Sequence, residues 1–191
     1  MQKPDGVLWL NGPFGGGKSS VARRLTAGHA GAVLFDPEVL GAMLREILES
    51  PNGDFQDLPQ WRELLVETVA ILYRHGTSLI VMPMTVLRVC YLEELLTGLR
   101  ATGAPIWHVL LDASPTELER RIAADTEETE EARTWRGARL PDFVKARDEI
   151  LQFTSAVVST DGADVDCVAE RISNWLVGAP GESSRARATI I

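Results

Sequence analysis

The chain has 191 residues, of which 45% are hydrophobic and 24% are charged, and its formal net charge is −8. This length fits one domain with a sizeable core. The acidic balance argues against a surface that binds duplex nucleic acid, although a local pocket for a small anion remains compatible with it. No run of about 18 apolar residues suggests a transmembrane segment. Two widely spaced cysteines, Cys90 and Cys167, favour reduced thiols in a cytoplasmic protein.

Short apolar runs alternate with amphipathic segments along the chain. The predicted strands are 6–10, 32–35, 78–82, 106–111 and 156–159. The predicted helices are 18–27, one opening at 36–38, 60–74, 88–100, one opening at the capping box Ser114-Pro115-Thr116-Glu117, 143–153 and 164–177. This alternation predicts an α/β fold, with a five-stranded parallel sheet between two helical layers. We expect a domain over 1–178 and a flexible tail over 179–191.

A glycine-rich loop follows the first predicted strand and leads into the first predicted helix. The residues of this loop are Gly12, Pro13, Phe14, Gly15, Gly16, Gly17, Lys18 and Ser19, which match the P-loop pattern G-x-x-x-x-G-K-[ST]. Glycines let backbone N–H groups approach phosphate oxygens, and the helix dipole adds positive charge there. Lys18 would reach the β- and γ-phosphates, and Ser19 would ligate Mg²⁺. The sequence therefore predicts ATP and Mg²⁺ as cofactors. Ser20 is a further hydroxyl with no assigned role.

Asp36 ends the second predicted strand, at the edge where parallel sheets bind their ligands. It is the candidate general base for an acceptor hydroxyl. It would otherwise orient a Mg²⁺-bound water, and as part of Asp-Pro-Glu it would also cap a helix. Asp112 ends the fourth predicted strand, where a structural role is favoured over metal binding.

The segments WLNGPFGGGKS, LFDPE, GDFQDLPQWREL and LIVMPMT, in this order, resemble those of the tunicamycin-resistance ATP-binding proteins, over about Val7 to Leu176. The chain also resembles P-loop kinases of the nucleoside-monophosphate kinase type, and chloramphenicol phosphotransferase shares this fold. The resemblance implies a sheet order of 2-3-1-4-5, a mobile arginine-bearing lid and ATP binding. It also implies tunicamycin as the partner, with phosphorylation of one of its hydroxyls as the reaction.

The same kinases suggest where an acceptor would bind. Phe55, Gln56 and Arg62 belong to a polar and aromatic cluster in the acceptor-binding region, where an aromatic and an amide would recognise a uracil-like base. Met84 and Thr85 follow the third predicted strand as candidate pocket residues. The acid and arginine that many of these kinases carry there are missing, which favours a less charged acceptor. Core packing is the alternative for Met84.

The expected lid spans about 124–140. Arg133 and Arg136 share a helical face with Arg139 and would bring positive charge to the γ-phosphate. A solvated helix with internal ion pairs is the alternative for each of them. Arg121, on the preceding helix, would contact the adenine or a phosphate.

Two other functions remain open from the sequence alone. The chain would bind the drug without phosphotransfer, or it would phosphorylate an ordinary nucleotide-like metabolite. The last predicted helix carries Val168, Ile172, Trp175 and Leu176 on one face, which would dock onto the sheet or, alternatively, touch lipid at a membrane surface.

Overall fold

The computed structural model describes residues 5–50, 52–126, 128–179 and 188–190. Its strands are β1 (Gly6–Asn11), β2 (Ala32–Leu34), β3 (Leu79–Pro83), β4 (Ile106–Asp112), β5 (Ala156–Ser159) and β6 (Ala188–Ile190). Its helices are α1 (Lys18–Gly28), α2 (Glu38–Arg45), α3 (Pro59–Arg74), α4 (Val89–Ala101), α5 (Pro115–Ala124), α6 (Glu130–Gly137), α7 (Leu140–Ile150) and α8 (Val165–Gly178), with 3₁₀ turns η1 (Phe55–Asp57) and η2 (Leu151–Phe153).

The strands form one parallel sheet in the order β2-β3-β1-β4-β5-β6. The order of the first five strands confirms the prediction. The prediction of five strands is wrong by one, because Ala188–Ile190 pair with Ala156–Val158 at the β5 edge. Most of the tail expected over 179–191 lies outside the described residues.

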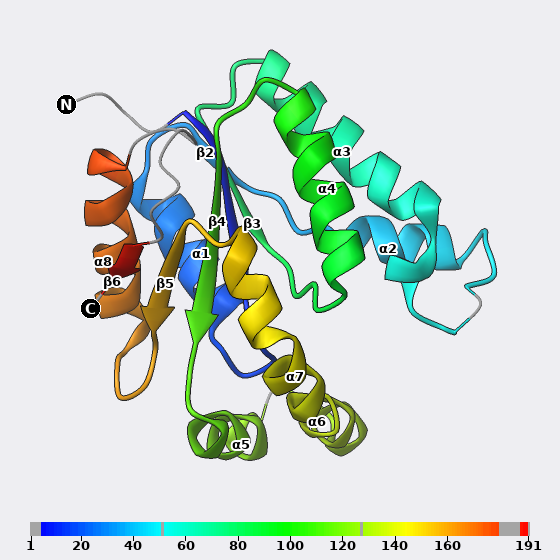
Figure 1. Cartoon of the computed structure of the whole chain (residues 1–191), viewed down its shortest axis with the longest axis vertical. Coiled ribbons are helices and arrows are strands. Elements are labelled where there is room, and N and C mark those ends of the chain that lie inside the picture. Colours follow the sequence, from blue (N-terminus) through cyan, green and yellow to red (C-terminus); the bar gives the residue numbers. More distant parts are fainter. Residues whose placement is uncertain (1–4, 51, 127, 180–187, 191) are drawn as a thin grey trace.

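Two helical layers cover the sheet, as Figure 1 shows. Side chains alternate along the central strands, so Val7 and Trp9 join the core under α3, α4 and α7, while Leu8 and Leu10 join the core under α1 and α8. Burial on both faces explains why the central strands read as continuous apolar runs. Val168, Ile172 and Leu176 of α8 are buried in the core on this face of the sheet, and Trp175 is partly buried against it, which confirms that α8 docks onto the sheet.

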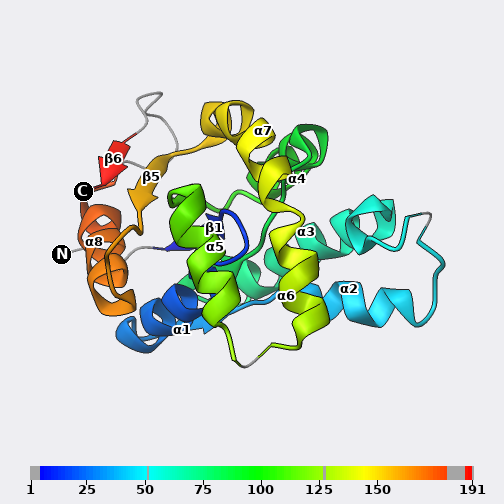
Figure 2. The same cartoon turned by 90° about the horizontal axis from the view of Figure 1, so that it is seen from below.

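The lid and the phosphate loop meet at the carboxyl edge of the sheet. The arrows of β4 and β5 point toward α5 and α6, and Figure 2 shows α5, α6 and α7 in front of the strands when this edge is viewed from below. Side-chain caps set the helix starts, with Ser114 accepting from the Glu117 amide and Thr129 accepting from the Ala132 amide. Within the described residues, no helix is long and apolar enough to cross a membrane.

Candidate functional site

The loop between β1 and α1 has the backbone of a phosphate cradle. Gly15 and Gly17 have φ of 78° and 83°, in the left-handed region that favours glycine. A Cβ on Gly12 would lie 2.4 Å from the Leu111 carbonyl oxygen, so the loop packs directly on β4. A Cβ on Gly17 would meet nothing within 4 Å, which leaves open space where α1 begins. These features fit a phosphate group at the N-terminus of α1.

Lys18 lies across this loop. Its ammonium donates to the Pro13 carbonyl over 2.7 Å and sits 5.6 Å from the centroid of the Phe14 ring. Burial lowers the pKa of Lys18 to about 7, partly offset by the charge of Glu38, while Arg136 lowers it further. Ser19 and Ser20 are exposed in the first turn of α1.

A buried polar network fixes the start of the loop. The Asn11 side-chain oxygen accepts from the amides of Gly12 and Val86, at 2.8 and 3.1 Å, and its amide nitrogen donates to His108 Nε2 at 3.1 Å. Burial lowers the pKa of His108 to about 4, so the ring is neutral and its Nδ1 proton faces the Phe153 carbonyl. This network could not be predicted from the sequence, because its residues are far apart in the chain.

Most of the predicted acceptor residues lie around one cavity. Thr85 donates to the Gly12 carbonyl, and the Gln56 amide donates to the Thr85 carbonyl over 2.8 Å. Phe55 packs on Trp61 with their ring centroids 5.1 Å apart, and a Cβ on Gly41 would clash with the Phe55 ring. Phe55, Gln56, Met84 and Thr85 all line the cavity.

Arg62 lies behind this wall and supports it. It donates to the Gln56 carbonyl, pairs with Glu94 at 2.7 Å and stacks over the Tyr91 ring at 4.2 Å. It is buried and is absent from the cavity lining, so its contacts position Gln56 rather than reach a ligand.

The Asp36-Pro37-Glu38 turn presents two acids with different surroundings. One oxygen of Asp36 accepts from the Glu38 amide over 3.0 Å, which orients the carboxylate at the start of α2. Asp36 lies outside the cavity lining, whereas Glu38 lies in it. Burial and the neighbouring Asp36 raise the pKa of Glu38, while Lys18 and Arg136 act in the opposite direction. Glu38 was not among the site residues predicted from the sequence.

The lid closes over the loop through aromatic contacts. Trp135 of α6 packs edge-on against Phe14 at 5.1 Å, and Arg136 lies 5.9 Å from the centroid of the same ring. Arg136 also pairs with Asp125 at 3.3 Å and Glu128 at 2.5 Å.

The other two lid arginines differ in their contacts. Arg133 donates to the backbone carbonyls of Asp125 and Glu128 and so stabilises the turn that precedes α6. Arg139 lies over the Trp135 ring at 3.8 Å and lines the cavity. The structure therefore brings Arg136 and Arg139, but not Arg133, to the cavity.

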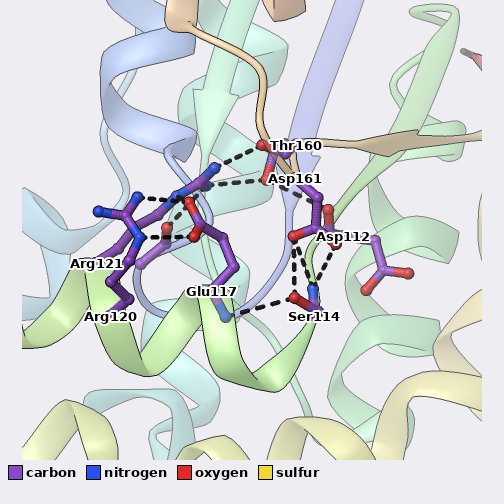
Figure 3. A network of polar contacts seen from close by, with 8 residues as sticks. Asp112, Ser114, Glu117, Arg120, Arg121, Thr160 and Asp161 are labelled. Carbon is purple, nitrogen blue, oxygen red and sulfur yellow. Dashed lines mark hydrogen bonds and ion pairs between the residues drawn. The ribbon is translucent and has the colours of Figure 1, made fainter.

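Arg121 links α5 to the P-loop and to the turn after β5 (Figure 3). It pairs with Glu117 at 2.7 Å and donates to the hydroxyl and carbonyl oxygens of Thr160, with a longer contact of 3.4 Å to the Gly15 carbonyl. These contacts connect α5 to the backbone of the P-loop at Gly15 and to Thr160. Asp112 pairs with Arg147 at 2.6 Å, a contact that fits the structural role favoured from the sequence.

The cavity beside the loop has a volume of about 1010 Å³. Its walls come from the P-loop, α2, the η1 segment, the residues after β3, the lid and one face of α7. This volume suits a small molecule, and Phe14 of the P-loop borders it. Among the described residues, no group of three or more His, Cys, Asp or Glu side chains forms a dedicated metal site.

Comparison with known proteins supports this assignment of fold. The family described as an AAA domain matches residues 7–149. No curated protein matches the chain. The tunicamycin resistance protein of Deinococcus radiodurans is 24% identical, with 92% of this chain and 98% of that one covered at a TM-score of 0.71.

Two further solved structures extend the likeness to small-molecule kinases. A gluconokinase from Sinorhizobium meliloti is 17% identical, with coverage of 93% and 94% and a TM-score of 0.64. The shikimate kinase of Acinetobacter baumannii is 15% identical, with coverage of 92% and 95% and the same TM-score. At these identities the likeness establishes the fold. The chain therefore belongs to the AAA domain family and has the fold of the small P-loop kinases.

Proposed function

We propose that this protein is an ATP- and Mg²⁺-dependent phosphotransferase that acts on a hydroxyl group of tunicamycin or a similar nucleoside antibiotic. The observation that carries the proposal is the cavity of about 1010 Å³ that opens beside the phosphate cradle. The drug enters the proposal through the name of the Deinococcus radiodurans protein and through the sequence segments quoted above.

In the proposed reaction the acceptor oxygen forms a bond to the γ-phosphorus, while the bond from that phosphorus to the β–γ bridging oxygen breaks and ADP leaves. Asp36 accepts the hydroxyl proton through the oxygen that the Glu38 amide does not hold. Lys18 and Arg136 neutralise charge on the transferring group. Ser19 and Asp36 would hold Mg²⁺, which would supply charge neutralisation on the phosphate groups.

The acceptor binds on the other side of the reacting group. Glu38 contacts its hydroxyl groups from α2, and Phe55 and Gln56 contact its ring from the η1 segment. Met84 and Thr85 form the floor, where the Thr85 hydroxyl is tied to the Gly12 carbonyl. The lid excludes water when Trp135 rests on Phe14.

Incubation of the protein with ATP, Mg²⁺ and tunicamycin is expected to add one phosphate to the drug. Mass spectrometry of the drug, with omission of ATP as the control, measures this directly. Drug binding at saturation with no added phosphate would contradict phosphotransfer and favour a sequestering protein. Transfer to a common nucleotide-like metabolite, but not to the drug, would instead identify a metabolic kinase.

The lowered pKa of Lys18 predicts a pH dependence of nucleotide binding. With its pKa at about 7, the free protein loses the ammonium charge as the pH rises, and bound phosphates restore it by raising that pKa. ADP affinity is therefore expected to fall by up to about tenfold between about pH 7.5 and about pH 8.5, with proton uptake on binding. Calorimetry in two buffers of different ionisation enthalpy measures both effects. The slope should vanish in Lys18→Met, and a slope that persists there would assign it elsewhere.

A further inference from the structure

Asn11, the last residue of β1, uses every hydrogen-bonding site of its side-chain amide. The oxygen accepts from the backbone amides of Gly12 and Val86, at 2.8 and 3.1 Å. The nitrogen donates to the Val86 carbonyl and to His108 Nε2, each at 3.1 Å. Asn11 and His108 are buried, so water does not compete for these bonds. One side chain therefore joins the start of the P-loop to the segment after β3 and to β4.

The segment after β3 also binds β1 and the P-loop directly. Trp9 Nε1 donates to the Met84 carbonyl at 3.0 Å, and the Thr85 hydroxyl donates to the Gly12 carbonyl at 2.9 Å. Gly12 is thus held through its carbonyl by Thr85 and through its amide by Asn11. A shift of the loop at Gly12 would move the floor of the cavity with it.

His108 holds the connection that returns from the lid to the sheet. Its Nδ1 lies 3.0 Å from the Phe153 carbonyl oxygen. Its backbone carbonyl accepts from the Ser155 amide at 2.7 Å, and its backbone amide donates to the Ser155 hydroxyl at 3.3 Å. Both partners lie between α7 and β5, in the connection that Figure 2 shows. Asn11 and His108 therefore link the P-loop, the floor of the cavity and the connection from the lid.

The backbone fixes the direction of each bond along this path. The Phe153 carbonyl can only accept, so Nδ1 of His108 carries the ring proton. The amides of Gly12 and Val86 can only donate, so the Asn11 oxygen faces them and the Asn11 nitrogen faces Nε2. That nitrogen acts only as a donor, so Nε2 must accept, and the ring must be neutral.

The surroundings of His108 favour this neutral form. Burial lowers the pKa of His108 to about 4, and the charge of Arg100 lowers it further, while the bond to the Phe153 carbonyl acts in the opposite direction. The ring also lies edge-on to Trp9, with the centroids 5.0 Å apart. His108 therefore carries a single ring proton, on Nδ1, throughout the neutral pH range.

We propose that Asn11 and His108 are positioning residues of the nucleotide site, in which the unprotonated Nε2 of His108 holds the Asn11 amide in the orientation that sets the start of the P-loop for ATP. This inference rests on the nucleotide-binding part of the proposed function and needs neither the drug nor phosphotransfer. Both residues act through Gly12, on which the placement of the Gly15–Gly17 amides depends. Loss of the amide donor would leave two acceptors facing each other beneath the loop.

Asn11→Asp tests this directly, because a carboxylate keeps the acceptor for the Gly12 and Val86 amides but has no donor for Nε2. One proton bound between the introduced carboxylate and Nε2 restores the missing bond, and the carboxylate raises the pKa of the ring. Relative to the wild-type protein, the variant is expected to bind ADP with Mg²⁺ about tenfold or more weakly at about pH 8, and within about threefold at about pH 6. Calorimetry at both pH values measures this ratio, in which the contribution of Lys18 cancels.

Further variants assign the effect to the ring. His108→Gln offers the same acceptor and donor as the neutral ring and is expected to keep ADP affinity within about threefold, whereas His108→Leu should lower it by about fivefold or more. The double variant Asn11→Asp/His108→Gln should lose the pH dependence of the ratio, because glutamine does not titrate. Asn174→Asp, on the exposed side of α8, is the matched control and should behave as the wild type at both pH values. Thermal unfolding shows whether each variant is folded.

NMR of the ¹⁵N-labelled wild-type protein tests the tautomer without a change at the site. The chain has three histidines, and His29→Gln and His75→Gln assign the other two rings. His108 is expected to stay in the Nδ1–H form between about pH 5.5 and about pH 8, with and without ADP. A ring protonated on Nε2, or one that titrates near its ordinary pKa, would overturn the inference even where Asn11→Asp does not fold.

The binding results separate this inference from the proposed function. Weakening in Asn11→Asp that is equal at both pH values, or no weakening, would overturn the positioning role alone. No ADP binding by the wild-type protein would refute the nucleotide site, and the positioning role with it. Normal ADP binding without phosphotransfer to the drug would refute the proposed reaction and not the positioning role.

Discussion

Replacing Lys18 by methionine is expected to lower the rate of phosphotransfer by about a hundredfold to a thousandfold. The ammonium is the cation nearest the phosphate cradle, and methionine keeps much of the side-chain volume without the charge. Steady-state kinetics with ATP and the acceptor measures the loss.

The fold should survive this change, because Lys18 makes a single hydrogen bond, to the Pro13 carbonyl, worth about 1 kcal/mol. Unfolding by denaturant checks this. Arg23→Met, on the exposed side of the same helix, is the matched control and should keep full activity. Normal turnover in folded Lys18→Met protein would show that the loop does not serve catalysis.

Replacing Asp36 by asparagine is expected to lower kcat by about a hundredfold to ten-thousandfold while ADP affinity stays within about threefold. Asparagine preserves the acceptor for the Glu38 amide, so the start of α2 is maintained and only the proton-accepting group is lost.

Glu38→Gln is the paired variant, because Glu38 lines the cavity and Asp36 does not. The proposed roles predict a higher acceptor KM, by about threefold to tenfold, with kcat little changed. A large loss of kcat in Glu38→Gln and a small one in Asp36→Asn would reverse the two assignments and make Glu38 the base.

Local sequence patterns predicted the first five strands of the sheet, but they did not predict β6. Strands β1, β3 and β4 are long apolar runs because both faces of the sheet are covered. The sixth strand has three residues, follows a segment rich in Gly, Ser and Arg, and carries no periodicity of its own. Its pairing with β5 is a tertiary contact, which no local window of sequence contains.

The same limit applies to the candidate site: local motifs could be predicted from the sequence, and contacts between distant residues could not. The P-loop is contiguous in sequence, so the motif predicts its residues and their roles. The contacts of Arg62 and Arg133 depend on which carbonyls the fold places beside them, and both turn toward the backbone. Arg139 looks like any charge on a solvated helix until the fold places it over Trp135 at the cavity wall.

A crystal structure with a non-hydrolysable ATP analogue, Mg²⁺ and tunicamycin tests the proposed reaction most directly. We expect the γ-phosphate to lie against Lys18 and the Gly15–Gly17 amides, with one drug hydroxyl between that phosphorus and Asp36. We expect the drug to lie in the cavity lined by Glu38 and Gln56. A drug bound away from this cavity, or one with no hydroxyl facing the γ-phosphate, would contradict it.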